Sequence, residues 1–440
     1  MPAARPARHG LPGAPRQGVR VHAQQLGAHR QRGRGQVHDT RHSVGVPPEQ
    51  QLHVPHGARG AGRARRAAQD TEQVLLRAVR ATPRPAQVRD SITAISPTEN
   101  CYADANEGWG GCSEQWDGAR IGLDGAKERY LADDAYQLTD LSPAMGKLLS
   151  GMERVFVLKP DGGRYSPAFV EATQAFHSKF FAGDFLVEQL RVVKSENELN
   201  RMRFAADIGA QGFIDMMKNT RPGMTELALG STFEGSVKKN GALWNAFPNV
   251  VGSGSNAAVI HYLSKRDLLR ENELVLVDSG CEVAGGYASD ITRTWPVGGK
   301  LTSGQTTMYE FVLDVQKKCI EHLRKKIETE ESITLNELHD YSVEIMMERM
   351  LDFGILKNKG GAFSRSAMRE FQKYNPTHIG HYLGMDTHDT PHITRGAPLV
   401  PGMVVTVEPG IYLPKNDLNL PEELRGIGIR IEDDVVVRAS

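Results

Sequence analysis

Residues 271–297, "ENELVLVDSGCEVAGGYASDITRTWPV", contain two strand-like runs on either side of a glycine pair. The apolar run "LVLV" predicts a strand that delivers Asp278 at its end, and "YASDITRTWPV" predicts a second strand that carries Asp290. Gly285 and Gly286 supply the positive φ of a tight turn, so the two strands are predicted to form an antiparallel hairpin. Two aspartates on paired strands are able to face one point. For this hairpin alone, we favour the simpler interpretation that they flank turns.

Two further carboxylates lie in β-branched runs near the C-terminus. "GMVVTVEPGIYLP" places Glu408 at the end of one run, and "RGIGIRIEDDVVV" places Arg430 and Glu432 two apart, on one face of a strand. Glutamate is a poor occupant of an apolar strand unless it is paired or binds a metal. These positions therefore favour a functional role. Asp433 and Asp434 are expected to be surface or turn residues.

A histidine-rich stretch, "PTHIGHYLGMDTHDTPH" at residues 376–392, is ambiguous alone, because most histidines are structural. Beside the carboxylates it completes a candidate metal site. The candidate ligands are Asp278, Asp290, His381, Glu408 and Glu432. Four negative charges would balance two divalent cations, and oxygen-rich ligation with one imidazole favours manganese, or another hard-to-borderline divalent ion, over a tetrahedral zinc site. Two such ions would activate water and polarise a carbonyl.

The zero net charge of the chain hides an asymmetry between its ends. Residues 1–90 hold 16 Arg, no Lys and 5 acidic residues, a net charge of +11, so the other 350 residues carry −11. An acidic body suits cations better than nucleic acid, and we expect no nucleic-acid partner.

The Arg-rich N-terminal stretch has little apolar periodicity apart from "EQVLLRAV" at 72–79, so residues 1–90 are expected to be mostly disordered. Three origins stay open: a basic arm, a mitochondrial transit peptide, or a frame or splice error in the gene model. We favour the last, because arginine without lysine in an Ala/Gly/Pro background is what a GC-rich coding sequence yields in the wrong frame. Sequencing the transcript would test it.

The composition becomes globular from about residue 111. Ser195 followed by Glu198 is a capping-box signature and predicts a long helix that opens a second domain. The expected divisions are therefore a low-complexity segment at 1–110 and domains at 111–190 and 191–440. Four cysteines without C-x-x-C spacing argue against a disulfide scaffold or a cysteine zinc site. No apolar run is long enough to predict a membrane span.

The ordered motifs "VDSG…YASDITRTWP", "GHYLGMDTHD", "VTVEPGIY" and "GIGIRIEDD" resemble the pita-bread metallopeptidases of the Xaa-Pro aminopeptidase (aminopeptidase P) family. The likeness covers about residues 114–440 and is strongest to the mitochondrial, intermediate-cleaving members. It implies an α+β fold, in which a C-terminal pita-bread (creatinase/aminopeptidase) catalytic domain follows a partial N-terminal α/β domain. It also implies a mitochondrial protein, or alternatively a cytoplasmic one, that forms a homodimer.

The resemblance implies two divalent metal ions, usually manganese, held by the five candidate ligands, with Asp290 and Glu432 bridging them. Glu408 would also be the base. The remaining implied roles are proton transfer by His261, contact with the peptide carbonyl by His388, and orientation of Glu408 and the metals by Tyr412 and Arg430. The substrate would be a peptide or protein N-terminus, cleaved at its first bond, preferentially Xaa-Pro, or a processed mitochondrial precursor that loses one residue.

The chain departs from the family pattern in two places. Asp278 and Asp290 are 12 residues apart, one more than usual, so the turn at the glycine pair or a bulge must absorb one residue. Thr377 stands where many relatives carry a further histidine. We expect His378 and His392 to be structural. Rival functions are a binding module that has lost catalysis, and a creatinase-like or methionine aminopeptidase activity. Retention of all five ligands argues against the binding module.

Overall fold

The protein is described by a computed structural model that covers residues 74–78, 91–96, 122–130, 132–159, 164–357 and 364–438. The chain forms two compact units that divide between Val187 and Glu188. The expectation of disorder at residues 1–90 lies outside the described residues, apart from β1 (Val74–Ala78), which falls in the one apolar run noted there.

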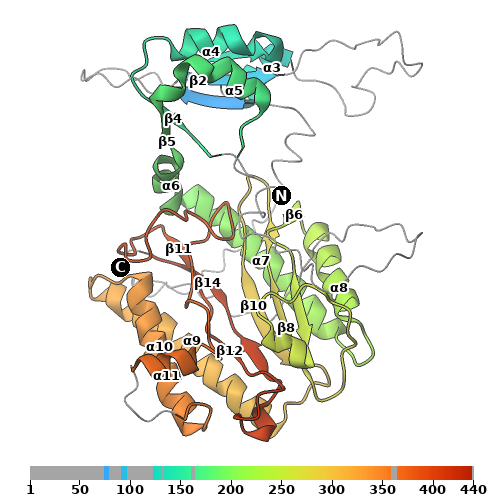
Figure 1. The fold of residues 1–440 in the computed structure, drawn as a ribbon. Helices are drawn as coiled ribbons and strands as arrows, with labels where there is room; N and C mark the ends of the chain where they lie inside the picture. The colour runs from blue at the N-terminus through green and yellow to red at the C-terminus, as the bar shows by residue number, and fades with distance from the viewer. Residues whose placement is uncertain are drawn as a thin grey trace, which may run out of the picture. The chain divides into compact units, whose positions relative to one another are not determined.

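The N-terminal unit contains a small mixed sheet and short helices (Figure 1). Its three-stranded sheet has the order β1-β2-β3, with β1 antiparallel to β2 and β2 parallel to β3. A second, two-stranded parallel sheet joins β4 and β5. The elements after β1 are β2 (Ser91–Ser96), α3 (Gly122–Tyr130), β3 (Asp134–Gln137), α4 (Leu141–Leu149), β4 (Val155–Val157), α5 (Pro167–Thr173) and β5 (Phe180–Ala182). Helix α6 (Asp184–Val192) crosses into the second unit.

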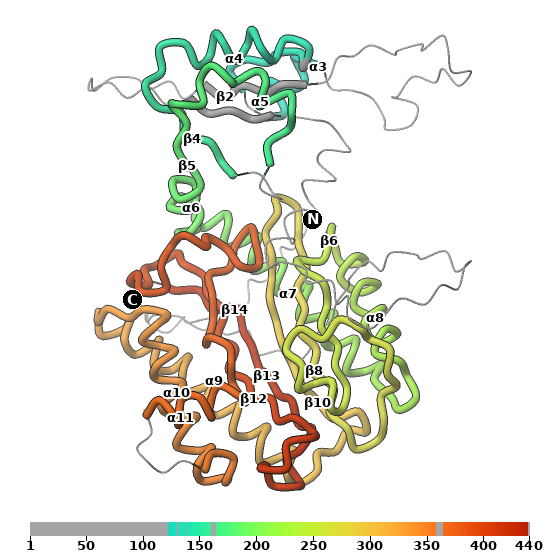
Figure 2. Tube along the Cα trace, viewed as in Figure 1, coloured from blue at the N-terminus to red at the C-terminus, as the bar shows by residue number. Residues whose placement is uncertain are grey.

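The C-terminal unit begins its main body with α7 (Glu196–Asn219), and the predicted capping box is confirmed. The Ser195 side chain accepts a hydrogen bond from the Glu198 backbone N–H, and the Glu198 carboxylate accepts one from the Ser195 backbone N–H. Helix α8 (Glu226–Lys239) packs beside α7 (Figure 2). Together they cover an antiparallel sheet of order β10-β8-β7. The strands are β7 (Val250–Ser253), β8 (Leu274–Ser279) and β10 (Ile291–Pro296).

The second half of this unit pairs two-stranded antiparallel ladders, β11-β14 and β12-β13, with three helices. The elements are α9 (Ser303–Glu328), α10 (Leu335–Asp352), α11 (Arg365–Phe371), β11 (Val404–Val407), β12 (Gly410–Tyr412), β13 (Gly428–Arg430) and β14 (Asp433–Val436). Apolar residues of α9 and α10 form one core with these strands. A bridge between Thr292 and Glu432 joins the two halves at β10, so the ligand-bearing strands of both halves adjoin (Figure 1).

The packing of strand β8 determines on which face of the sheet the site lies. Val275 and Val277 pack into the cluster with α7 and α8. Because side chains alternate along a strand, Leu276 and Asp278 face the other side, and Leu276 does pack with Tyr412 instead. The site therefore lies on the sheet face that the α7–α8 pair does not cover. No helix within the described part of the chain is long and apolar enough to cross a membrane.

Candidate metal centre

The first hairpin brings Asp278 and Asp290 to one face. Thr292 of β10 pairs with Asp278 of β8, and Asp290 lies two residues before Thr292, so both aspartates share that face. The same register continues to the turn, where the Val283 N–H donates to the Tyr287 carbonyl over 3.0 Å. Gly285 and Gly286 adopt φ values of +93° and +85° within the turn. The twelve-residue spacing is thus accommodated in the turn, as predicted, and Asp290 does not face away.

Thr292 and Arg430 connect the two halves of the site. The Thr292 hydroxyl donates to the Glu432 carboxylate over 2.5 Å and accepts from Arg430 Nε over 2.9 Å. Arg430 also donates to Asp278 Oδ2 over 2.6 Å and to the Tyr412 hydroxyl over 2.7 Å. The guanidinium is buried and planar, so one side chain fixes the relative positions of three others.

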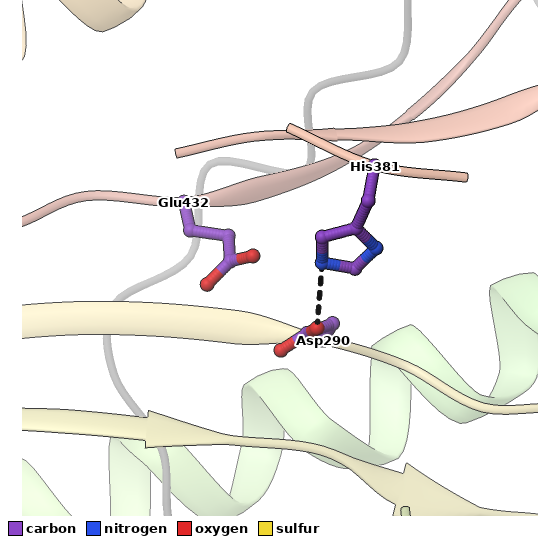
Figure 3. Close-up of side chains that lie close together, drawn as sticks. All are labelled: Asp290, His381 and Glu432. Atoms are coloured by element: carbon purple, nitrogen blue, oxygen red, sulfur yellow. Dashed lines mark ion pairs between the residues drawn. The ribbon is translucent and has the colours of Figure 1, made fainter. Parts of the chain in front are cut away.

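His381 presents a ring nitrogen to the carboxylates. Its Nδ1 lies 3.1 Å from the Tyr382 carbonyl and must be the protonated, donating nitrogen, which leaves the Nε2 lone pair available. Nε2 lies 3.5 Å from Asp290 Oδ2 and 3.5 Å from Glu408 Oε1. One ligand atom each from Asp290, His381 and Glu432 lies within 4.8 Å of the others (Figure 3). This tautomer and donor set fit a divalent cation.

A backbone contact places His381. Residues 379–383 run alongside β11: the Thr406 N–H donates to the His381 carbonyl and the Glu408 N–H to the Ile379 carbonyl. A Cβ on Gly380 would lie 2.0 Å from the Thr406 carbonyl oxygen. Only glycine allows the two chains to approach this closely, so Gly380 sets the depth at which the imidazole enters the site.

We therefore expect Gly380→Ala to lower the free energy of unfolding by about 2 kcal/mol or more, because backbone must move on both strands. Guanidinium unfolding of the purified variant measures this. Gly235→Ala is the matched control, since a Cβ at this exposed position of α8 meets no atom within 4 Å and alanine is the better helix former. Equal stabilities for the two variants would contradict the packing argument.

The two remaining catalytic candidates are placed differently. The His388 ring lies 4.4 Å from the His381 ring, at 75°, and His388 is an exposed residue, so the structure does bring it to the site. His261 is exposed, and it follows Ile260, which packs against the cluster containing Tyr412. The structure thus places the His261 segment beside Tyr412, while its proton-transfer role stays a prediction.

The histidines expected to be structural have other partners. His378 stacks on His339 at 4.3 Å, and its Nδ1 donates to the Gly380 carbonyl over 3.0 Å. Burial, with the neighbouring His339, lowers the pKa of His378 to about 4, so this ring is neutral at physiological pH. His392 pairs with the Glu188 carboxylate over 2.7 Å.

Sequence reasoning was wrong to expect Asp433 and Asp434 in a turn, because both lie in strand β14. Asp433 is buried and forms an ion pair with Arg293. Asp434 accepts the Asp290 backbone N–H over 3.2 Å, directly behind the metal site. The run "IEDDVVV" contained a signal for this burial. If the strand continues past Glu432 and pairs with β11, every second residue must be buried. Thr292 was also missed, although it lies two residues after Asp290 on the same face.

The buried carboxylates carry more negative charge than Arg430 balances. Burial raises the pKa of Asp290 well above its ordinary value, and the charges of Asp278, Asp434 and Glu408 raise it further. Burial likewise raises the pKa of Glu432 and of Glu408, and it raises the pKa of Asp434 to about 8. Such a cluster is stabilised either by protons or by cations.

It follows that the metal-free protein should become less stable as the pH rises. The folded state keeps protons that the unfolded chain has released, so the stabilisation is complete below the unfolded pKa of about 4. It is lost as the pH rises through the folded values, which reach about 8 for Asp434. Bound cations would replace those protons. Melting temperatures between pH 5 and 8 should therefore diverge between EDTA-treated and Mn²⁺-loaded samples, and a constant gap would contradict the charge argument.

The candidate site combines carboxylate oxygens with one imidazole, at the boundary between the two halves of the C-terminal unit. This set of ligands defines a class of protein that binds divalent cations in a buried centre. Residues 200–439 match the metallopeptidase family M24, and the chain belongs to that family. The predicted family membership is thereby confirmed.

Curated relatives and solved structures agree with this assignment. The chain is 39% identical over 330 residues to Xaa-Pro aminopeptidase 3 of Rattus norvegicus, covering 74% of this chain and 63% of that protein. It is 37% identical to the mitochondrial intermediate cleaving peptidase 55 of Arabidopsis thaliana, covering 73% and 62%. Aminopeptidase P of E. coli, in its low-pH form, superposes with a TM-score of 0.71 at 27% identity, covering 87% of this chain and 93% of that chain. The chain thus spans slightly less than two thirds of the length of these two curated relatives. The similarity to the solved aminopeptidase P structure confirms the predicted pita-bread fold.

Proposed function

We propose that the chain is a metal-dependent aminopeptidase that hydrolyses the first peptide bond of a peptide or protein. The observation that carries the proposal is the convergence of Asp290, His381 and Glu432 on one point, with Glu408 beside them. Similarity to proteins named Xaa-Pro aminopeptidase and intermediate cleaving peptidase supports this reaction over a creatinase-like one. We propose Xaa-Pro peptides, or processed mitochondrial precursors that lose one residue, as substrates, and the mitochondrion as the location.

The proposed ligands of two divalent cations are the five carboxylate and imidazole residues predicted from the sequence. They are Asp278, Asp290, His381, Glu408 and Glu432. We propose manganese, because oxygen donors outnumber the single imidazole. Divalent cations, when bound, supply an activated water and polarise the carbonyl of the first peptide bond.

The remaining steps belong to side chains of this chain. Glu408, whose Oε1 lies 3.5 Å from His381 Nε2, takes the proton of the attacking water. His388, beside His381, donates to the oxygen of the peptide carbonyl as charge develops there. His261 carries a proton to the departing amine. Arg430 orients Asp278 by donating to it, and the Tyr412 hydroxyl holds the guanidinium by accepting from it. We propose that these two residues also orient Glu408 and the metals.

The proposal is tested with two peptides, one that begins Xaa-Pro and one that begins Tyr or Leu followed by a residue other than proline. Purified full-length protein with added Mn²⁺ should release the first residue of at least one of them. Glu408→Gln, which keeps the size of the side chain but not its charge, should release neither. Bound metal without cleavage of either peptide would overturn the peptidase function and favour a binding role.

A further inference from the structure

The loop that carries His388 is held by three charged residues of one short segment. Glu188 and Arg191 lie in the last part of α6, and Lys194 follows two residues after the helix ends. They are spaced three residues apart. Each contacts a residue of the stretch 386–392, about 200 positions later in the chain. Residues on both sides of His388 are therefore tied to the same segment.

The central contacts are ion pairs, one of them fully buried. Lys194 Nζ lies 3.2 Å from Asp389 Oδ2, and the two side chains are 1% and 0% exposed. Arg191 donates to Asp386 over 2.6 Å and also pairs with Asp389. The Nη2 atom of one guanidinium thus bridges the aspartate two positions before His388 and the aspartate one position after it.

Further contacts close the loop around these pairs. The Asp389 N–H donates to the Tyr382 carbonyl over 2.9 Å, and a Cβ on Gly384 would lie 2.2 Å from Asp389 Oδ2. At the far end, the Glu188 carboxylate accepts from the His392 backbone N–H over 2.7 Å as well as pairing with its ring. His388 itself is exposed between these fixed points, with His381 as its ring neighbour.

We propose that Arg191 and Lys194 are positioning residues that hold His388 in its place over the metal centre. The inference rests on the proposed function, in which His388 meets the peptide carbonyl. An exposed histidine on a loop without this support would sample many orientations, and a small displacement of a catalytic group is costly in rate.

A double-mutant cycle tests whether Arg191 acts through His388. Arg191→Met should lower kcat about 10- to 100-fold, with KM and metal content little changed. In a His388→Ala background the same substitution should change kcat less than about twofold, because its only route to the reaction has been removed. Arg191→Lys, which keeps the charge but not the length and planar shape of the guanidinium, should be intermediate. An equal loss in both backgrounds would overturn the proposal.

A second measurement does not depend on catalysis. In metal-free protein, hydrogen exchange of peptides from residues 384–392 should be faster in Arg191→Met than in the unmodified chain. Arg324→Met is the matched control, since Arg324 pairs only with glutamates of its own helix α9 among its described partners, and it should leave the loop unchanged. Unaltered exchange in Arg191→Met would overturn the positioning role. Failure of the unmodified protein to cleave either peptide would refute the proposed function, while the exchange result still decides the inference.

Discussion

Asp290→Asn is expected to abolish activity and, in the same molecule, to make the metal-free protein harder to unfold. The substitution removes a charge that two cations would share, and a loss of about 4 kcal/mol of electrostatic stabilisation corresponds to roughly 1,000-fold in kcat/KM. It also removes the carboxylate whose pKa is raised by burial and by Asp278, Asp434 and Glu408. Without metal that carboxylate is a source of repulsion, so its loss is favourable.

The two effects are measured separately. Metal content by mass spectrometry should fall well below two ions per chain, and the melting temperature in EDTA at pH 8 should rise by about 2–4 °C, which is about 1 kcal/mol for a domain of this size. Asp433→Asn is the matched control, because Asp433 is equally buried but forms an ion pair with Arg293. It should keep its metal and lose stability. A variant of Asp290 that melts lower in EDTA would contradict this account.

The sequence was sufficient for those parts of the site that depend on local patterns. Strand alternation and the glycine pair predicted the hairpin, and they predicted that its turn absorbs the extra residue between Asp278 and Asp290. The capping box predicted the start of α7. These features are short-range, and each residue type is dictated by its neighbours within a few positions.

The parts that could not be predicted depend on contacts between distant segments. Arg191 meets Asp389 across 198 positions, and nothing in "VEQLRVVKS" distinguishes it from an exposed arginine. The strand that carries Asp433 was readable from its alternation, but the side-chain partners that bury Asp433, Arg293 and Gln316, lie 140 and 117 positions earlier. Burial of a charged residue is a property of the pairing, and a single sequence does not reveal the pair.

Arg430→Met should be the most destabilising single change at the site. The guanidinium is 2% exposed and donates to Thr292, Tyr412 and Asp278. Methionine fills much of the space but leaves the Asp278 carboxylate buried without this cation, a situation that costs about 3–5 kcal/mol. The loss should be larger in EDTA than in Mn²⁺, since bound cations would balance the same carboxylates.

Guanidinium unfolding of Arg430→Met, with and without metal, measures both the loss in the free energy of unfolding and its dependence on metal. Arg293→Met is the matched control, because Arg293 is also a buried arginine of the sheet, but its aspartate partner is Asp433, which lies outside the proposed ligand set. We expect Arg293→Met to be destabilised by a similar amount in either condition. If metal protected both variants equally, the ion pair between Arg430 and Asp278 would have only a structural role. If metal protects Arg430→Met alone, the Arg430 guanidinium and the bound cations stabilise the same carboxylates. That shared stabilisation is the electrostatic basis of the proposed centre.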